Sequence, residues 1–184
     1  MHKKAALIVL MIIGLLLMGC DVGFGSKYAD DPREYRDWEA YLDIPSFLPN
    51  SIVDYQANGY SYTLLAYMDI CFEIFLDISV SEEQFGQLLA DARSHGEYTE
   101  KEAYYCDGYF EIVFQDDYEI YRGKEDLTEN VGWADIEKVI YNSETLTIIY
   151  VCFHANDTGV YPLTDVAYFN RFSINQENYV ANLE

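Results

Sequence analysis

The sequence predicts an α+β domain built on a mostly antiparallel sheet, with one or two helices packed on one face and a short N-terminal helix. Two observations support this fold class. Apolar or aromatic residues occupy every second position from Tyr60 to Val80, which is typical of strands. Residues 81–96 then show helical spacing with capping signals at both ends. The chain has 184 residues, 51% of them hydrophobic, so it can form one globular core.

The expected N-terminal helix begins near residue 31. Asp31 is placed to cap it, Pro32 occupies the first helical position, and Glu34 follows three residues after the cap. Its apolar face would consist of Tyr35, Trp38 and Leu42. We expect this helix to lie on the domain surface.

The alternating segment 60–80 is longer than a typical strand of about 5–6 residues. We therefore expect two strands with a break near Met68 and Asp69. The alternation predicts one buried face, and Cys71 lies on the other face, where it would be less buried.

The helix after these strands is the clearest element in the chain. Ser81 can cap it and Gln84 can complete a capping box. The apolar stripe consists of Phe85, Leu88, Leu89 and Ala92. Gly96 ends the segment. A helix with one apolar face, following strands, predicts a helix layer packed on a sheet.

The second half of the chain contains further turns and strands. Asp107 and Gly108 predict a hairpin turn, because Gly tolerates the positive φ that such turns need. The polar segment 116–132 predicts a long connection, with a short strand at Tyr118–Tyr121 as an alternative within it. Residues 133–141 are compatible with a helix or with the first strand of a hairpin into 146–153, and we favour the hairpin. A last helix could start at Pro162, with an apolar face of Leu163, Val166, Phe169 and Phe172.

The N-terminus carries targeting information. Basic residues at 2–4 precede the uncharged segment 5–18, which is short for a membrane span of roughly 20 residues. The segment ends in Leu17, Met18, Gly19 and Cys20, a pattern that resembles the lipobox of bacterial lipoproteins. The resemblance implies cleavage before Cys20 and lipidation of its thiol, and it covers only residues 1–20.

The resemblance implies a signal peptide at 1–19 with the lipid on Cys20. From the residues that follow, we expect a lipidated flexible spacer at 20–30 and a single α+β domain at 31–184. We expect an extracytoplasmic protein held on a bacterial membrane by its lipid, since two or more acyl chains anchor a protein stably. Without the signal peptide, the chain keeps 9 basic and 32 acidic residues, a formal charge of −23. Such an acidic chain argues against nucleic acid as a partner.

Few residues suggest catalysis. Cys152 and His154 lie two apart on a predicted strand and would share a face, as a thiol–imidazole pair requires. No motif for a serine hydrolase, a zinc protease or a nucleotide site occurs, so we assign no catalytic residues and no cofactor. Cys152 and His154 are therefore kept as candidate site residues without an assigned role.

Metal binding and disulfide formation stay open. After lipidation of Cys20, the three remaining cysteines are Cys71, Cys106 and Cys152, which lack zinc-site spacing. They allow three alternative disulfides and leave at least one thiol free. The acidic pairs at 30–31 and 116–117 could attract calcium, but no EF-hand spacing is present, and we favour a solvated acidic surface, which explains the same residues.

Our leading functional hypothesis is a non-enzymatic binding or interaction module whose protein, peptide or glycan ligand is unknown. The alternatives are a surface enzyme that uses Cys152 and His154 or an unassembled carboxylate pair, and a calcium-binding surface protein.

Overall fold

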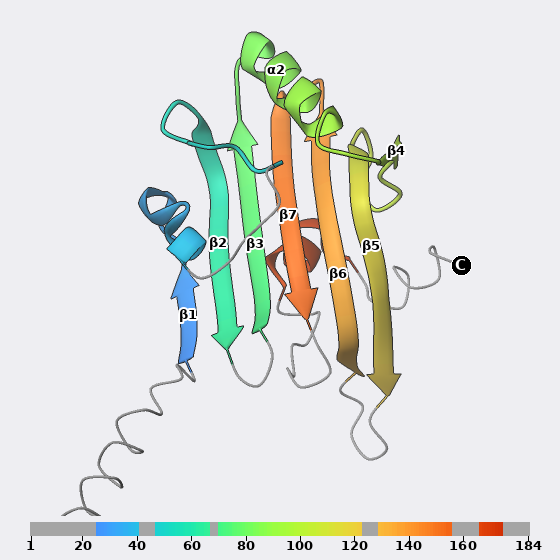
Figure 1. The fold of residues 1–184 in the computed structure, drawn as a ribbon. Helices are drawn as coiled ribbons and strands as arrows, with labels where there is room; N and C mark the ends of the chain where they lie inside the picture. The colour runs from blue at the N-terminus through green and yellow to red at the C-terminus, as the bar shows by residue number, and fades with distance from the viewer. Residues whose placement is uncertain (1–24, 41–46, 67–69, 123–128, 156–165, 175–184) are drawn as a thin grey trace, which may run out of the picture.

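The computed structural model describes residues 25–40, 47–66, 70–122, 129–155 and 166–174. These residues contain a seven-stranded sheet with strand order β1-β2-β3-β7-β6-β5-β4 (Figure 1). All neighbouring strands pair antiparallel. The mostly antiparallel sheet expected from the sequence is therefore confirmed.

The strands are β1 (Gly25–Ala29), β2 (Gln56–Ala66), β3 (Ile70–Ser79), β4 (Thr99–Glu102), β5 (Phe110–Arg122), β6 (Glu129–Asn142) and β7 (Thr147–Ala155). The last strand returns to the centre of the sheet, where β7 pairs with both β3 and β6. Two segments far apart in the sequence, β3 and β7, thus lie side by side.

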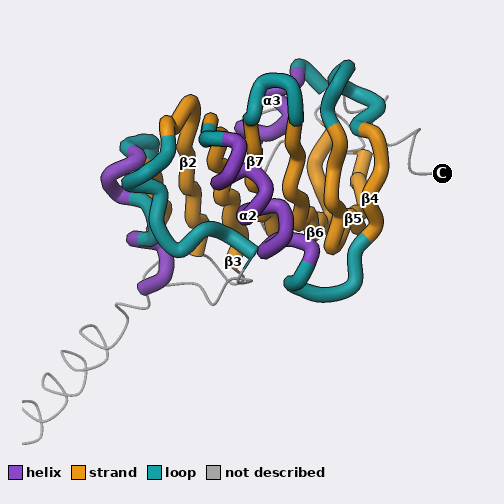
Figure 2. Tube along the Cα trace, turned by 90° about the horizontal axis from the view of Figure 1, so that it is seen from above, coloured by secondary structure: helices purple, strands orange, loops and turns teal. Residues whose placement is uncertain are grey.

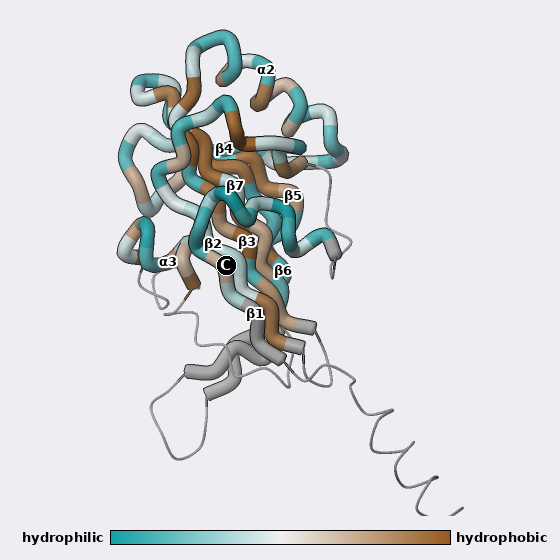
Figure 3. The backbone as a smooth tube through the Cα atoms, turned by 90° about the vertical axis from the view of Figure 1, so that its left-hand side faces the viewer, coloured by the Kyte–Doolittle hydropathy of each residue, from teal (hydrophilic) through white to brown (hydrophobic). Residues whose placement is uncertain are grey.

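The two α-helices that the structure describes lie on opposite faces of the sheet. Helix α2 (Glu82–Arg93) crosses the ends of the central strands (Figures 1 and 2). The short helix α3 (Ala167–Phe172) lies on the other side (Figure 3). The expectation that the helices share one face is therefore wrong. We call the two sides the α2 face and the α3 face.

The central strands explain why both faces are covered. Along β3, Ile74 and Ile78 belong to the core of the α2 face, whereas Cys71 and Phe75 belong to the core of the α3 face. Cys71 is only 2% exposed, so the prediction that it would be less buried is wrong. A strand that is apolar on both sides must be covered on both sides.

The N-terminal helix is replaced by two 3-10 helices, Pro32–Glu34 and Asp37–Ala40. Asp31 does cap the first one, since its side chain accepts the backbone N–H of Arg33 at 3.0 Å. Arg36 then adopts a φ of 74°, which interrupts a regular helix. Trp38 packs into the α2-face core, and Leu42 lies outside the described residues.

Helix α2 agrees with the prediction in detail. The capping box is formed, because the backbone N–H of Ser81 donates to Gln84 Oε1 at 2.9 Å and the N–H of Gln84 donates to Ser81 Oγ at 3.4 Å. The buried side chains of the helix are those of the predicted stripe, namely Phe85, Leu88, Leu89 and Ala92.

The segment 116–132 is not one long connection, which corrects the sequence-based expectation. β5 and β6 form an extended hairpin that pairs from Phe110 with Tyr141 to Arg122 with Glu129. The predicted hairpin of 133–141 with the following strand is confirmed as β6 and β7. Gly108 has the expected positive φ of 78°, but the connection between β4 and β5 spans 103–109 instead of a two-residue turn.

Part of the segment 20–30, which the sequence predicts to be a flexible spacer, forms the edge strand β1 of the sheet. Gly25–Ala29 forms β1 and pairs with β2 from Gly25 with Ala66 to Ala29 with Tyr62. Cys20 and the lipobox lie outside the described residues, as do Pro162 and Leu163.

Candidate ligand pocket

A pocket of about 560 Å³ opens on the α2 face, between helix α2, the segment 47–55 and strand β7. This volume lies within the roughly 300–1,000 Å³ of small-molecule sites. The side chains that matter below are Phe47, Asp54, Tyr55, Asp91, His95 and Tyr150.

The segment 47–55 is held in place from two sides. Tyr35 and Arg36 both donate to the carbonyl oxygen of Pro49, at 2.8 Å and 3.1 Å. From the other side, Gln84 Nε2 donates to the carbonyl oxygen of Asp54 at 3.4 Å. Gln84, which completes the capping box of α2, thus also ties one wall of the pocket to the helix.

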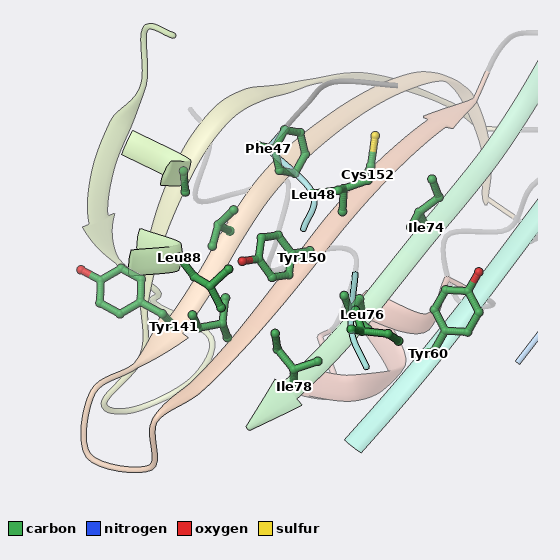
Figure 4. Close-up of a cluster of buried hydrophobic side chains, with 14 of the residues drawn as sticks. Phe47, Leu48, Tyr60, Ile74, Leu76, Ile78, Leu88, Tyr141, Tyr150 and Cys152 are labelled. Carbon is green, nitrogen blue, oxygen red and sulfur yellow. The ribbon is translucent and has the colours of Figure 1, made fainter. Parts of the chain in front are cut away.

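Aromatic and aliphatic side chains form the inner part of the pocket. Phe47 stacks on Phe114 with ring centroids 5.0 Å apart and meets the ring of His95 edge-on at 5.5 Å. Figure 4 shows Tyr150 projecting from β7 close to Leu48 and Leu88, which also line the pocket. The inner end of the pocket is therefore formed by buried apolar and aromatic side chains, which we call its apolar base.

Tyr150 is the most unusual residue of the pocket. It is 1% exposed, and burial raises the pKa of its hydroxyl. Within the described part of the chain this hydroxyl has no hydrogen-bond partner, and its oxygen is not among the fully enclosed polar atoms that lack one, so it is open to the pocket. The hydroxyl of a buried, pocket-lining tyrosine is therefore available to a ligand.

Two aspartates supply the charge of the pocket. Burial raises the pKa of Tyr55, and the negative charges of Asp54 and Asp91 raise it further. After burial and the neighbouring tyrosines, Asp91 also raises the pKa of Tyr150. Asp91 therefore acts electrostatically on both tyrosine hydroxyls and Asp54 on that of Tyr55, and among the described lining residues there is no lysine or arginine.

The candidates Cys152 and His154 do lie on one face, but they do not form a catalytic pair. Cys152 is 1% exposed, and burial raises the pKa of its thiol well above the usual value. His154 Nδ1 instead contacts a carboxylate oxygen of Asp135, and its ring stacks on Phe72. A buried, neutral thiol is a poor nucleophile.

The other cysteines do not suggest chemistry either. Cys71, Cys106 and Cys152 are free thiols in the structure. Cys71 and Cys152 lie on opposite faces of the sheet, in separate cores, which explains why they cannot pair with each other.

The α3 face contains a charged layer that the sequence analysis missed. Lys138 Nζ lies 2.6 Å from Asp116 Oδ2 and 3.5 Å from Glu111 Oε2, and all three side chains are at most 8% exposed. Strict alternation along β5 would place Glu111 and Asp116 on opposite faces, and the β-bulge between Val113 and Gln115 brings both to the face of Lys138, so the sequence pattern alone does not reveal this layer. Because the charges compensate one another, we interpret this layer as structural.

Two further acids of β3 lie against α3. Glu73 accepts the backbone N–H of Ala167 at 2.6 Å, and Asp77 accepts from Arg171 Nε at 2.8 Å. Burial raises the pKa of Glu73 to about 7, although the hydrogen bonds from Ala167 and Tyr168 oppose this shift. These contacts fasten the short helix to the sheet.

The acidic pairs considered for calcium are not assembled into a site. Asp116 pairs with Lys138, and Asp31 pairs with Arg33. Within the described ranges, no three potential metal-ligating side chains lie close enough to hold an ion.

No protein-family model, curated protein or solved structure matches this chain. Of the helices that the structure describes, none is long and apolar enough to cross a membrane.

Proposed function

We propose that the protein is a lipoprotein of the bacterial cell envelope, anchored by lipid on Cys20 and exposed outside the cytoplasm. The lipobox at 17–20 supports this proposal. The described residues begin with the edge strand β1 at Gly25, four residues after Asp21. A lipid on Cys20 would thus hold the sheet close to the membrane surface.

We further propose that the domain is a non-enzymatic binding module whose ligand occupies the pocket beneath α2. The observation that carries this proposal is the buried Tyr150, which lines a pocket of about 560 Å³ and has no hydrogen-bond partner among the described residues. Its oxygen is not among the fully enclosed polar atoms that lack a partner, so water can bond to it when the pocket holds no ligand. A ligand that bonds to this hydroxyl would take the place of that water.

The alternative functions have less support. A surface enzyme that uses Cys152 and His154 needs an accessible thiol, and Cys152 is buried. A calcium-binding role needs several oxygen ligands around one ion, and no such group occurs within the described ranges. Binding therefore remains our proposal.

The proposal can be tested by NMR on the mature lipidated chain in detergent micelles. The probes are small organic fragments, divided equally among neutral, cationic and anionic compounds. We expect some fragments to shift the amide signals of Tyr55, Asp91 and His95 selectively. If no fragment shifts these signals, the pocket is not a binding site.

Two tryptophan substitutions at exposed serines provide a matched control. Ser51→Trp places a large ring at the pocket wall, whereas Ser143→Trp places it in the turn between β6 and β7. Fragment shifts should disappear in Ser51→Trp and persist in Ser143→Trp. Persistence in both variants would move the binding site elsewhere.

A further inference from the structure

We propose that the pocket beneath α2 binds a small organic cation, with an ammonium group directed at Asp54 and Asp91. This inference rests on the proposed binding function and names the class of ligand.

The charge of the pocket favours a cation. Asp54 and Asp91 line it, and of its described lining residues none is lysine or arginine. Arg36 contacts the segment 47–55, where it donates to Pro49 O and Asn50 Oδ1, and it forms an ion pair with Glu39. His95 also lines the pocket. The 184-residue chain as a whole carries a formal net charge of −21 at pH 7. An anion would enter against this field, and a cation would be attracted.

The aromatic residues also suit an organic cation. Alkylammonium groups bind favourably against the faces of Tyr, Phe and Trp rings, and Phe47, Tyr55 and Tyr150 all line the pocket. An ammonium N–H can donate to a phenol oxygen. Tyr150, buried and without a hydrogen-bond partner in the described chain, offers such an acceptor beside the charge of Asp91.

A bare metal ion suits the pocket less well. Calcium takes 6–8 oxygen ligands, and the pocket offers two carboxylates on separate elements, Asp54 on the segment 47–55 and Asp91 on α2. An ammonium carried on a carbon chain would instead use the carboxylates and the apolar base together.

Three probes of equal length separate charge from size: 1,6-hexanediamine, 1,6-hexanediol and adipate. Their binding to the mature lipidated protein in detergent can be compared by isothermal titration calorimetry at pH 8 and low salt. We expect the diamine to bind at least about tenfold more tightly than the diol, and adipate not to bind. Added sodium chloride should weaken the binding of the diamine, because salt screens the attraction between its ammonium groups and the carboxylates.

Substitutions that remove charge without changing size test the residues. Asp54→Asn and Asp91→Asn should each weaken diamine binding by roughly three- to tenfold, a modest effect because both aspartates are exposed to solvent. Asp117→Asn removes the same charge at an exposed position of β5 outside the pocket, and should leave binding unchanged. Unchanged thermal melting would show that each variant is folded.

The outcomes separate this inference from the proposed function. Equal binding of diol and diamine, or tighter binding of adipate, would overturn the cation and keep the pocket as a binding site. If Asp117→Asn weakens diamine binding as much as the pocket variants do, the net charge of the protein attracts the diamine and not the two pocket carboxylates, which also overturns the inference. If calcium binds at the pocket and displaces the diamine, the site takes a metal ion. If neither the diamine nor any fragment perturbs the pocket, both proposals fail.

Discussion

The hydroxyl of Tyr105 donates a hydrogen bond of 2.5 Å to Oε2 of Glu111 within the α3 face of the sheet. Glu111 is fully buried, and its other oxygen lies 3.4 Å from Lys101 Nζ. Tyr105 belongs to the connection between β4 and β5, so this bond ties that connection to the charged layer.

Removal of this hydroxyl should destabilise the protein. Tyr105→Phe leaves a buried carboxylate oxygen with one donor fewer, and we expect a loss of about 1–3 kcal/mol in the free energy of unfolding. Tyr150→Phe is the matched control: its hydroxyl has no partner among the described residues, so its removal should change stability by less than about 0.5 kcal/mol. Urea denaturation measures both. Equal losses of unfolding free energy in the two variants would contradict the prediction, because they would mean that the hydroxyl of Tyr150 stabilises the fold as much as that of Tyr105 does.

Lys138 should be the most sensitive charged residue of the sheet. Lys138→Met removes the cation that faces Glu111 and Asp116, and the buried carboxylates then lack compensation. We expect a loss of about 3–5 kcal/mol. Adding Glu111→Gln should restore part of it. A loss below about 1 kcal/mol for Lys138→Met would show that the charged layer is hydrated or rearranged.

Glu73 should make stability depend on pH. Burial raises its pKa from 4.5 to about 7. Between these values the folded protein holds a proton that the unfolded chain has released, so stability falls as pH rises through this window and levels off above it. The expected decrease is on the order of 3 kcal/mol.

The control for this pH effect is Glu73→Gln, which keeps an oxygen to accept the N–H of Ala167 but has no charge. Urea denaturation from pH 5 to pH 8 should give a flatter stability profile for the variant than for the wild type. Parallel profiles would assign the pH dependence to other groups.

Local signals explain which elements were predicted correctly. The capping box of α2 and its apolar stripe depend on residues within one short segment, and the structure reproduces both. The same holds for the alternation in β2 and β3. The sequence does not predict that β3 is buried on both faces, with Ile74 on one and Cys71 on the other. This burial depends on β7 and α3, which are distant from β3 in the sequence.

The charged layer and the pocket were missed for a related reason. Asp116 and Lys138 look like surface residues until the β5–β6 register places them together. Tyr150 looks like an ordinary strand residue, and its importance depends on the segment 47–55 folding over β7. The sequence does predict that Cys152 and His154 share a face, because that follows from their spacing alone.

The proposed membrane anchor depends on one thiol. Cys20→Ala should abolish lipid attachment and leave unprocessed precursor that retains residues 1–19. Metabolic labelling with a fatty acid, followed by detergent partitioning, measures both effects. Cys106→Ala is the control, since its partly exposed thiol lies in the folded domain. Equal labelling of the Cys20→Ala variant would contradict the lipoprotein proposal.

The most direct test of the proposed binding function is a crystal structure of the mature protein soaked with 1,6-hexanediamine. We predict density for the diamine beneath α2, with one nitrogen within hydrogen-bond distance of Asp91 and close to the hydroxyl of Tyr150. A well-ordered structure in which this pocket stays empty, or is filled by the protein's own side chains, would contradict the proposed function.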